Sequence, residues 1–284
     1  MSQYVVDAHV HLWNTSDHDW YPALHQMSEQ LGKPELYDNF LVDDYRRAAC
    51  DLPVRKLVHV SATTKPRAYL NETAWIDALA DAHGLDLVII GAVDPSLSEK
   101  EIVADLEQQA RSPRFRGVRV LHDFEPDSAA AGVVLDWLQD RDLIFDLVTQ
   151  PVQMWSWLET LRHYPELTVA LEHTGWPAGT HTDARASWQH AITAFAEESW
   201  ALCKVSGLGM TTMDLSEAAL RPWVERAIET VGWDRVAFGS NIPIEHMAGR
   251  YGQLQRSLEA ILSEASEGER ARFYAGNAER VYRL

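Results

Sequence analysis

Two histidines lie two positions apart in the apolar stretch YVVDAHVHLWN, residues 4–14. If this stretch is a β-strand, His9 and His11 point to the same side, because side chains alternate between the two faces of a strand. Neutral imidazoles can bind a divalent metal ion such as zinc, or they can donate a hydrogen bond to a carbonyl oxygen. They can also be core histidines that hydrogen-bond to their neighbours, so other polar residues must decide whether this pair does chemistry.

Further polar side chains lie in later apolar stretches or directly after them. His173 closes LTVALEH, Arg119 lies in FRGVRVL and Lys204 lies in ALCKVSG, while His59 lies in KLVHVSA and Asn241 follows RVAFGS. A guanidinium and an ammonium could hold a carboxylate or an oxyanion while imidazoles polarise a carbonyl. These residue types favour hydrolysis of an activated ester or lactone, with or without a metal ion.

Several of these side chains also have a structural interpretation. Arg119 could form a surface salt bridge, although a mid-strand arginine flanked by valines is poorly placed for one. Lys204 could pair with Glu172 instead of binding substrate. Glu172 is expected on the opposite side of its strand from His173 and is interpreted as structural. Asp146 could balance the charge of nearby cations or act in catalysis.

Eight β-rich stretches alternate with longer amphipathic ones, which is typical of an α/β protein with a parallel sheet and crossover helices. Eight such units in 284 residues predict a single-domain (β/α)₈ TIM barrel over residues 1–284. An open doubly wound sheet would require a glycine-rich phosphate turn after an early strand, and none is visible. The predicted strands cover residues 4–12, 56–62, 85–93, 115–121, 143–148, 167–173, 201–207 and 235–240.

Two of the predicted helices have clear end signals. NETAWIDALADAHG has a capping residue at Asn71 and a stop at Gly84, and SEKEIVADLEQQAR begins after Ser98 with acidic residues in its first turn. Residues 14–40 form a long loop after the first strand that is rich in aromatics and histidines. Because loops after barrel strands build the active-site face, this loop is a candidate lid or pocket wall, or else a structural flap on the rim.

Strand alternation predicts which side chains face the barrel interior. In the sixth strand, Val169 and Leu171 are expected to direct His173 inward, and Lys204 and Ser206 share one face of the seventh. Because barrel active sites lie at the C-terminal ends of the strands, the polar residues should converge at one mouth. In the first strand, the shell face is predicted to be Val6, Ala8, Val10 and Leu12, and the interior face Val5, Asp7, His9 and His11.

The bulk composition restricts the classes of partner that the protein is expected to bind. A formal net charge of −17 repels nucleic acid and anionic membrane surfaces, so a small-molecule substrate is expected. Cys50 and Cys203 lie far apart, which predicts neither a disulfide framework nor a thiolate metal site. The sequence shows no secretion signal and no membrane span, which predicts a cytoplasmic protein. A homo-oligomer is compatible with these features.

Six segments together resemble the amidohydrolase superfamily. They are VVDAHVHLW, FRGVR, ALEHTGWP, KVSGL, FGSNIP and the closing GNAERVYRL, and they run from the first strand to the last residues. Within the superfamily, the resemblance is to the branch that holds 2-pyrone-4,6-dicarboxylate lactonase and the sugar lactonases acting on fuconolactone and rhamnonolactone. It implies a (β/α)₈ barrel that hydrolyses a lactone or a related C–O bond.

The resemblance also implies roles for single residues. His9 and His11 match the first-strand pair that polarises the substrate carbonyl, and His173 matches the sixth-strand histidine. Arg119 matches the arginine that contacts a substrate oxygen. Asn241 stands where most members have the aspartate that activates water. An amide cannot accept a proton at neutral pH, so another group must act as the base.

The resulting site prediction separates chemistry from substrate binding. The residues predicted to act in catalysis are His9, His11, His173 and Asn241, and those predicted to bind substrate are Arg119, Lys204, His59 and Trp176. The base candidates are His173, His9 and His11, followed by Glu245, His246 and Asp146. Trp13 and Trp20, like Trp176, could stack on a flat or sugar-like ring, although packing in the core is the commoner role.

Metal chemistry is predicted to be dispensable. An amide is a poorer ligand than a carboxylate, and the lysine and histidine of a two-metal site are not evident in the fourth and fifth strands. The prediction is therefore no cofactor, with one divalent cation such as zinc, held by His9, His11 and His173, as the alternative. The predicted activity is hydrolysis of a small carboxylated or polyhydroxylated lactone or ester. Decarboxylation, lactone isomerisation and ligand binding without catalysis are the alternatives.

Overall fold

The computed structural model describes residues 4–49, 52–198 and 200–284. The first three residues, where a leader would begin, and Cys50 lie outside the described residues, while Cys203 is a free, buried cysteine. No helix within the described ranges is long and apolar enough to cross a membrane.

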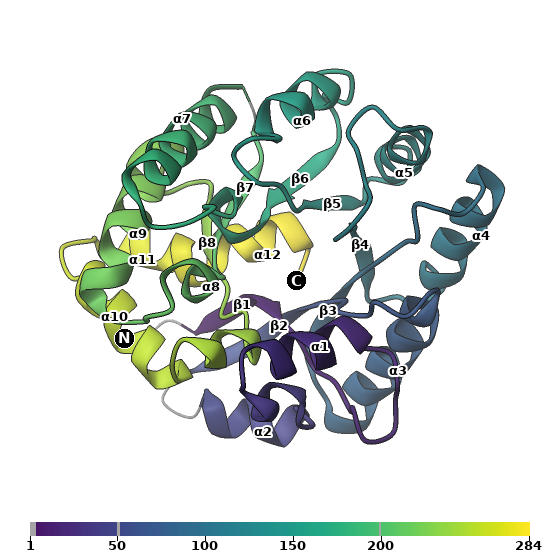
Figure 1. The fold of residues 1–284 in the computed structure, drawn as a ribbon, viewed down its shortest axis with the longest axis horizontal. Helices are drawn as coiled ribbons and strands as arrows, with labels where there is room; N and C mark the ends of the chain where they lie inside the picture. The colour runs from purple at the N-terminus through teal and green to yellow at the C-terminus, as the bar shows by residue number, and fades with distance from the viewer. Residues whose placement is uncertain (1–3, 50–51, 199) are drawn as a thin grey trace.

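Eight parallel strands follow one another in sequence order around a barrel, as predicted (Figure 1). Each predicted strand is present, and most are one or two residues shorter at either end. The strands are β1 (Val5–Val10), β2 (Val54–Val60), β3 (Asp86–Gly91), β4 (Phe115–Arg119), β5 (Ile144–Leu147), β6 (Thr168–Leu171), β7 (Leu202–Val205) and β8 (Val236–Phe238).

Helices surround the barrel, and the last one lies across the centre of the ring of strands in Figure 1. The α-helices are α1 (Pro22–Gln30), α2 (Val42–Ala48), α3 (Ala68–His83), α4 (Glu99–Gln109), α5 (Ala129–Gln139), α6 (Met154–Leu161), α7 (Thr182–Glu198), α8 (Leu208–Thr212), α9 (Glu217–Val231), α10 (Tyr251–Ile261), α11 (Glu267–Ala271) and α12 (Asn277–Tyr282). Short helical turns are η1 (Pro34–Tyr37), η2 (Glu172–Gly175), η3 (Ile244–Met247) and η4 (Arg272–Gly276).

The helix-end signals were partly right. Ser98 caps α4 in a capping box with Glu101, as predicted. Gly84 ends α3 in the left-handed conformation, also as predicted. Asn71 was wrong as the start of this helix, because α3 begins three residues earlier at Ala68 and Asn71 lies inside its first turn.

The barrel closes between β1 and the residues that follow β8. The Asn241 amide donates to the His9 carbonyl at 2.7 Å, and the His11 amide donates to the Ile242 carbonyl at 2.9 Å. The Asp7 carboxylate accepts a third hydrogen bond across this seam, from the Ser240 amide at 2.7 Å. The seam therefore runs directly beside both histidines of the first strand.

A buried apolar cluster from seven strands and the C-terminal helices fills the barrel interior. It contains Val6, Ala8, Val58, Val60, Val88, Ile90, Ile144, Ala170, Leu202, Ala237, Ala275, Ala278 and Tyr282. Val6 and Ala8 thus face inward, whereas Asp7 points to the helix shell and accepts a hydrogen bond from Tyr45 of α2 at 2.9 Å. The predicted faces of the first strand were therefore wrong for these three residues and for Val5, which packs in the larger apolar cluster with the helices. The cause is a register shift between Asp7 and Val10, and His9 turns inward within this shift.

The long segment after β1 is built of α1 and η1 and is fastened at both ends. Trp13 and Phe40 exchange backbone hydrogen bonds at 3.0 and 2.9 Å, which closes its base. Lys33 donates to the Met247 carbonyl at 2.6 Å, which connects the segment to η3 after β8. The segment therefore packs against the loops at the C-terminal end of the barrel.

Candidate active site

His9 and His11 lie together at the C-terminal end of β1. Their Nε2 atoms are 3.3 Å apart, and the His11 Nδ1 lies 2.7 Å from the Val60 carbonyl oxygen. Both residues are almost completely buried. The ring of Trp13 stacks on His11 with 5.9 Å between centroids, so this tryptophan supports the histidine from the core side.

Glu172 and His173 both enter the site, although neighbours in a strand would point apart. Ala170 faces inward, so regular alternation also brings Glu172 inward. The chain then turns, because His173 and Thr174 have left-handed φ values of 52° and 53°. This turn directs His173 back toward Glu172. The prediction that Glu172 points away, and that Val169 and Leu171 set the direction of His173, was therefore wrong.

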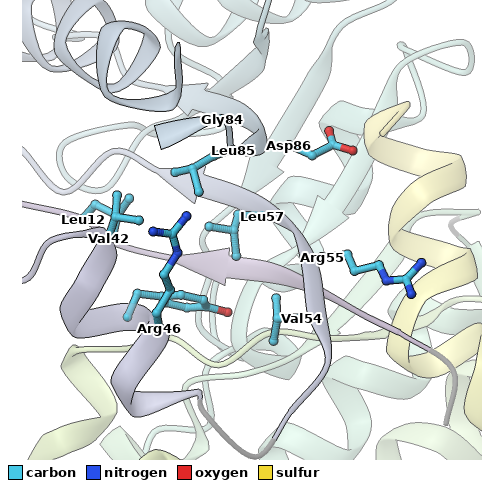
Figure 2. Close-up of a pocket in the computed structure, with 10 residues that line it drawn as sticks. Leu12, Val42, Arg46, Val54, Arg55, Leu57, Gly84, Leu85 and Asp86 are labelled. Carbon is cyan, nitrogen blue, oxygen red and sulfur yellow. The ribbon is translucent and has the colours of Figure 1, made fainter. Parts of the chain in front are cut away.

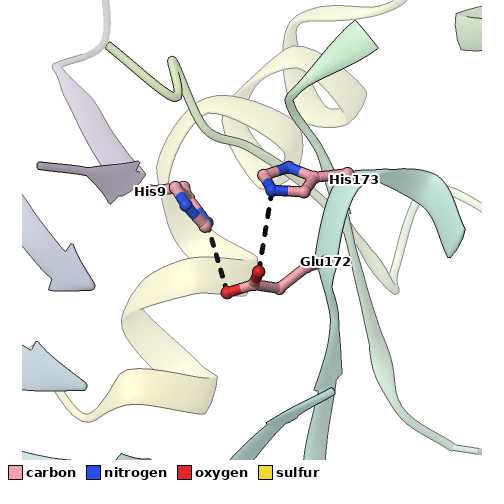
Figure 3. A group of neighbouring side chains, drawn as sticks. All are labelled: His9, Glu172 and His173. Carbon is pink, nitrogen blue, oxygen red and sulfur yellow. Dashed lines mark ion pairs between the residues drawn. The ribbon is translucent and has the colours of Figure 1, made fainter. Parts of the chain in front are cut away.

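Glu172 lies between the two histidines at the end of the barrel (Figure 3). Its Oε1 is 3.5 Å from His9 Nδ1 and its Oε2 is 3.6 Å from His173 Nε2. The same carboxylate pairs with Arg119 at 3.3 Å and with Lys204 at 3.4 Å. It is therefore the common acceptor of the site.

Lys204 connects Asp146 to these residues. Its Nζ lies 2.5 Å from Asp146 Oδ2 and 3.1 Å from His9 Nδ1, and its side chain is fully buried. Tyr282 of α12 donates to the other oxygen of Asp146 at 2.7 Å. We call the following residues the inner cluster: His9, His11, Arg119, Asp146, Glu172, His173 and Lys204.

The charges in the inner cluster follow from burial and from the two cations. Burial would raise the pKa of Glu172, but Arg119 and Lys204 outweigh this effect and lower its pKa to about 2. Burial raises the pKa of Asp146 to about 6, although Lys204 opposes it. Burial also lowers the pKa of His173 to about 4. At pH 7 the carboxylates are therefore charged and His173 is neutral.

His173 occupies its place because of the residues that follow β7. Ser206 Oγ lies 2.9 Å from His173 Nδ1, and Lys204 of β7 and Ser206 directly after it both face inward, as predicted. Gly207 is left-handed, with a φ of 65°, and a β-carbon there would overlap the His173 ring. Glycine at this position therefore allows the imidazole to lie against the strand end.

Asn241 and Glu245 form a separate pair beside the inner cluster. Asn241 has a left-handed φ of 54°, and its Nδ2 lies 3.5 Å from Glu245 Oε1. Glu245 is buried under α8, where it also accepts from the Gly209 amide at 3.3 Å. Burial raises the pKa of Glu245 to about 8, so this acid is mostly protonated at pH 7. His246 packs edge-on against Phe40 at 5.8 Å, on the side of the long segment.

His59 is not brought to the inner cluster. Val58 and Val60 face the barrel interior, so His59 points outward, where its Nε2 lies 3.9 Å from Glu72 of α3. Its Nδ1 accepts from the Leu12 amide at 3.3 Å. The structure therefore places this predicted substrate-binding residue in the helix shell.

The tryptophans considered for stacking have different surroundings. Trp176 is half-buried and presents its ring to the edge of His173, with 5.2 Å between centroids. Trp13 is fully buried and donates to the Asp38 carbonyl at 2.9 Å. Trp20 stacks on His18 at 3.8 Å, outside the inner cluster. Among these three, Trp176 is the one that contacts the His173 ring.

A cavity of about 220 Å³ opens beside the inner cluster, between the loops that follow β2, β3 and β4. Arg119 lines this cavity and also pairs with Glu172, so one side chain connects the cavity to the inner cluster. The other polar lining groups include Ser61, Thr63, Thr64, Lys65, Arg67, Asp94 and His122.

A second hollow, of about 190 Å³, lies elsewhere, between α2 and the start of β2 and β3 (Figure 2). It is lined by Leu12, Arg46, Leu57 and Asp86 among others, and by none of the predicted site residues. Arg46, one of its lining residues, pairs with exposed Asp43.

His9, Glu172 and His173 are residues of the types that bind metal ions, and their ligand atoms lie within 4.8 Å of one another. The predicted alternative of His9, His11 and His173 thus has Glu172 in place of His11. However, the Lys204 ammonium already lies 3.1 Å from His9 Nδ1 and 3.4 Å from Glu172. A divalent ion at this point would face that ammonium and the Arg119 guanidinium. The arrangement as it stands does not fit a dication.

The amidohydrolase family model matches residues 6–284, which is nearly the whole chain. The chain belongs to the amidohydrolase family. This amidohydrolase is 29% identical to the uncharacterized protein y4mH of Sinorhizobium fredii, over 99% of this chain and 98% of that protein. It is 26% identical to an L-fucono-1,5-lactonase of Burkholderia ambifaria, over 98% of this chain and 95% of the relative.

A crystal structure of an amidohydrolase from Burkholderia multivorans with bound zinc has the same fold. It superposes with a TM-score of 0.84 at 22% identity, over 99% of this chain and 100% of that one. The family resemblance read from the six segments is thus confirmed, as is the barrel. The carboxylate of Glu172 and the hydroxyl of Tyr282 were not predicted to join the site of this amidohydrolase.

Proposed function

We propose that this chain hydrolyses a small lactone or related ester that carries carboxylate or hydroxyl groups. The observation that carries the proposal is Arg119, which lines the cavity and pairs with Glu172 in the inner cluster. A guanidinium in this position can hold a carboxylate or a carbonyl oxygen of the substrate. The lactonase relative at 26% identity supports the reaction type.

His173 is the proposed proton acceptor for the attacking water. It is neutral at pH 7, because burial lowers its pKa to about 4. After it accepts a proton, the imidazolium would face Glu172 Oε2, which lies 3.6 Å from Nε2, and this carboxylate would stabilise it. Water would attack the carbonyl carbon, and the negative charge on its oxygen would meet Arg119 and the first-strand histidines. Collapse of this intermediate would break the C–O bond of the ester or lactone, and the leaving oxygen would take the proton from His173.

Asn241 has a different proposed role from the aspartate found at this position in most superfamily members. Its amide cannot take a proton from water at neutral pH. Its left-handed backbone donates to the His9 carbonyl at 2.7 Å, and its side chain is directed to Glu245. We propose that Asn241 supports the site through the barrel seam rather than as a base.

The proposed reaction has no step that runs through a metal ion. The ligand types of His9, Glu172 and His173 could support Lewis-acid chemistry if a cation displaced Lys204. The zinc in the Burkholderia multivorans structure belongs to that protein. The expected result is that wild-type turnover is unchanged after dialysis against a chelator and after addition of zinc. Loss of turnover on dialysis, with recovery on adding one equivalent of zinc, would contradict metal independence.

The activity is tested with a panel of lactones and a pH indicator that detects ring opening. The panel pairs sugar lactones with carboxylated lactones of similar size. Arg119→Met should raise KM most for the carboxylated members, while His173→Gln should lower kcat for all of them, by about a hundredfold or more. No ring opening across both classes would contradict the proposal.

The same assays separate the other candidate functions. Release of carbon dioxide without acid from ring opening would indicate decarboxylation, and a rearranged lactone would indicate isomerisation. Tight binding without turnover, lost in His9→Ala and His11→Ala, would indicate a binding protein. The small-molecule substrate, the cytoplasmic location and the compatibility with a homo-oligomer stay predictions from the sequence.

A further inference from the structure

A line of hydrogen bonds runs from the C-terminal helix through the barrel to its mouth. It begins at Tyr282 of α12, which is fully buried in the interior cluster and donates to Asp146 Oδ1 at 2.7 Å. Asp146 Oδ2 lies 2.5 Å from Lys204 Nζ, and this Nζ lies 3.1 Å from His9 Nδ1. The line therefore joins an end of the fold that is remote from the mouth to the first catalytic histidine.

The direction of the hydrogen bond between Lys204 and His9 follows from the donor chemistry. An ammonium group has three protons and no lone pair, so it can only donate. His9 Nδ1 must then accept, which means that it carries a lone pair. The two other donors of the ammonium are directed at Asp146 and Glu172. On a neutral ring, the proton of His9 is therefore on Nε2.

The surroundings of His11 lead independently to the same tautomer of His9. The Val60 carbonyl oxygen can only accept, so the His11 Nδ1 that lies 2.7 Å from it must be protonated. On a neutral ring, His11 Nε2 is then an acceptor, and the His9 Nε2 at 3.3 Å donates to it. Burial lowers the pKa of both histidines well below the usual value, which agrees with neutral rings.

A second group near His9, the Glu172 carboxylate, would favour the tautomer with the proton on Nδ1. Glu172 Oε1 lies 3.5 Å from His9 Nδ1, so this carboxylate would attract a proton to Nδ1 if no other donor were present. The Lys204 ammonium opposes this tautomer, because it donates both to His9 Nδ1 and to Glu172. The charged and titratable groups that face Lys204 are Asp146, Glu172, His9 and Tyr282, from β5, η2, β1 and α12.

We infer that Tyr282 and Asp146 are positioning residues that hold the Lys204 ammonium against His9 and so fix His9 with its proton on Nε2. That N–H points toward His11 through a long hydrogen bond of 3.3 Å, which a substrate carbonyl oxygen could replace. The inference depends on the proposed function only for its effect on turnover. The tautomer itself is a property of the free protein.

The tautomer can be measured by nitrogen NMR on protein labelled in its histidine rings. In the wild type at pH 7, His9 should show a protonated Nε2 and an unprotonated Nδ1. Lys204→Met should move the His9 proton toward Nδ1 or make the ring cationic, because Glu172 then faces Nδ1 alone. A wild-type His9 with its proton on Nδ1, or a cationic ring at pH 7, would overturn the inference.

Tyr282→Phe provides the milder variant, which keeps the ring packing and removes a single hydroxyl. Loss of this donor should raise the pKa of Asp146 above its value of about 6 and toward neutrality. The His9 ring nitrogens sense the protonation of Asp146 through Lys204. The pH midpoint of the change in their chemical shifts should therefore rise by roughly half a unit to one unit relative to the wild type. An unchanged midpoint would contradict the role of Tyr282.

Tyr21→Phe is the matched control, because Tyr21 is also buried and donates to a buried carboxylate, Glu72, at 3.1 Å. It lies outside the hydrogen-bond line, so the His9 midpoint should stay at the wild-type value. In the lactone assay, Tyr282→Phe should lower kcat about three- to tenfold with KM unchanged. A correct tautomer with no turnover of any lactone would refute the proposed function and leave this inference intact.

Discussion

Glu172 sets the charge balance of the inner cluster. It and Asp146 provide two negative charges against the two positive charges of Arg119 and Lys204, all of them buried. Buried ions persist only when they are paired with good geometry. The sequence suggested the cations and left Glu172 as a structural residue, so the centre of the site became visible only in three dimensions.

Glu172→Gln should damage both stability and activity. The substitution leaves two buried cations facing one carboxylate, which is expected to lower the free energy of unfolding by roughly 3–5 kcal/mol. It also removes the charge that would stabilise protonated His173. Urea unfolding at pH 7 and kcat on the best lactone measure the two effects. An active variant with wild-type stability would show that Glu172 is dispensable.

Glu245 should make the folded protein less stable as the pH rises. Its folded-state pKa of about 8 lies above the ordinary value of 4.5, so the folded protein binds more protons than the unfolded chain between these two values. Stability contributed by the protonated acid is therefore present below pH 4.5 and is lost as pH rises toward 8. Glu245→Gln should gain stability relative to the wild type over this window, by at most about 1.4 kcal/mol per pH unit. Urea unfolding at pH 5, 6, 7 and 8 tests this, and a difference independent of pH would refute it.

At the scale of elements, two short turns decide which side chains reach the mouth. The turn after β6 directs His173 toward Glu172, and the turn after β7 receives the imidazole over Gly207. The regular alternation stops one residue beyond each strand, at Glu172 and at Ser206. The site is thus built where strands stop, and the exact conformation of these residues matters more than strand periodicity.

Gly207→Ala should separate fold from function. A β-carbon at this left-handed position would overlap His173, so the imidazole must move and kcat should fall by at least about tenfold. Gly84→Ala is the control, because Gly84 has a similar φ of 60° with no atom near the added carbon. Both variants should lose roughly 1–2 kcal/mol of stability from backbone strain. Equal activity in the two variants would contradict the role of Gly207.

The same elements show what the sequence could predict. Lys204 and Ser206 were correctly placed on one face because β7 is regular, and each of the eight strands was found from its apolar pattern. His59 was misplaced because alternation alone does not say which face is inward. The register shift in β1 and the left-handed His173 have no composition signal, since glycine does not mark either position.

At the scale of the whole molecule, the barrel depends on one acidic residue at its seam. Asp7 accepts hydrogen bonds from Ser240 after β8, from the His9 amide at 3.3 Å and from Tyr45 of α2. It therefore ties the first strand both to the last strand and to the helix shell. The sequence motif DAHVH thus contains a closing residue as well as two histidines.

Asp7→Ala should loosen this closure. It leaves three buried donors without their acceptor, and unsatisfied buried groups cost about 1–3 kcal/mol each. We expect a loss of at least 3 kcal/mol in the free energy of unfolding, with faster amide exchange at Ser240. Asp17→Ala removes an exposed acceptor of the same type and should change stability little. Similar stability in the two variants would show that the seam closes without Asp7.

The burial of the inner cluster has a consequence for the time course of turnover. Its residues are at most 5% exposed, so a substrate in the neighbouring cavity meets Arg119 before any histidine of the inner cluster. Loops at the mouth must move before the carbonyl reaches His9, and such motions commonly limit enzyme rates. Turnover of the best substrate should therefore slow as solvent viscosity rises, and a kcat that is independent of added sucrose would show that chemistry, not opening, sets the pace.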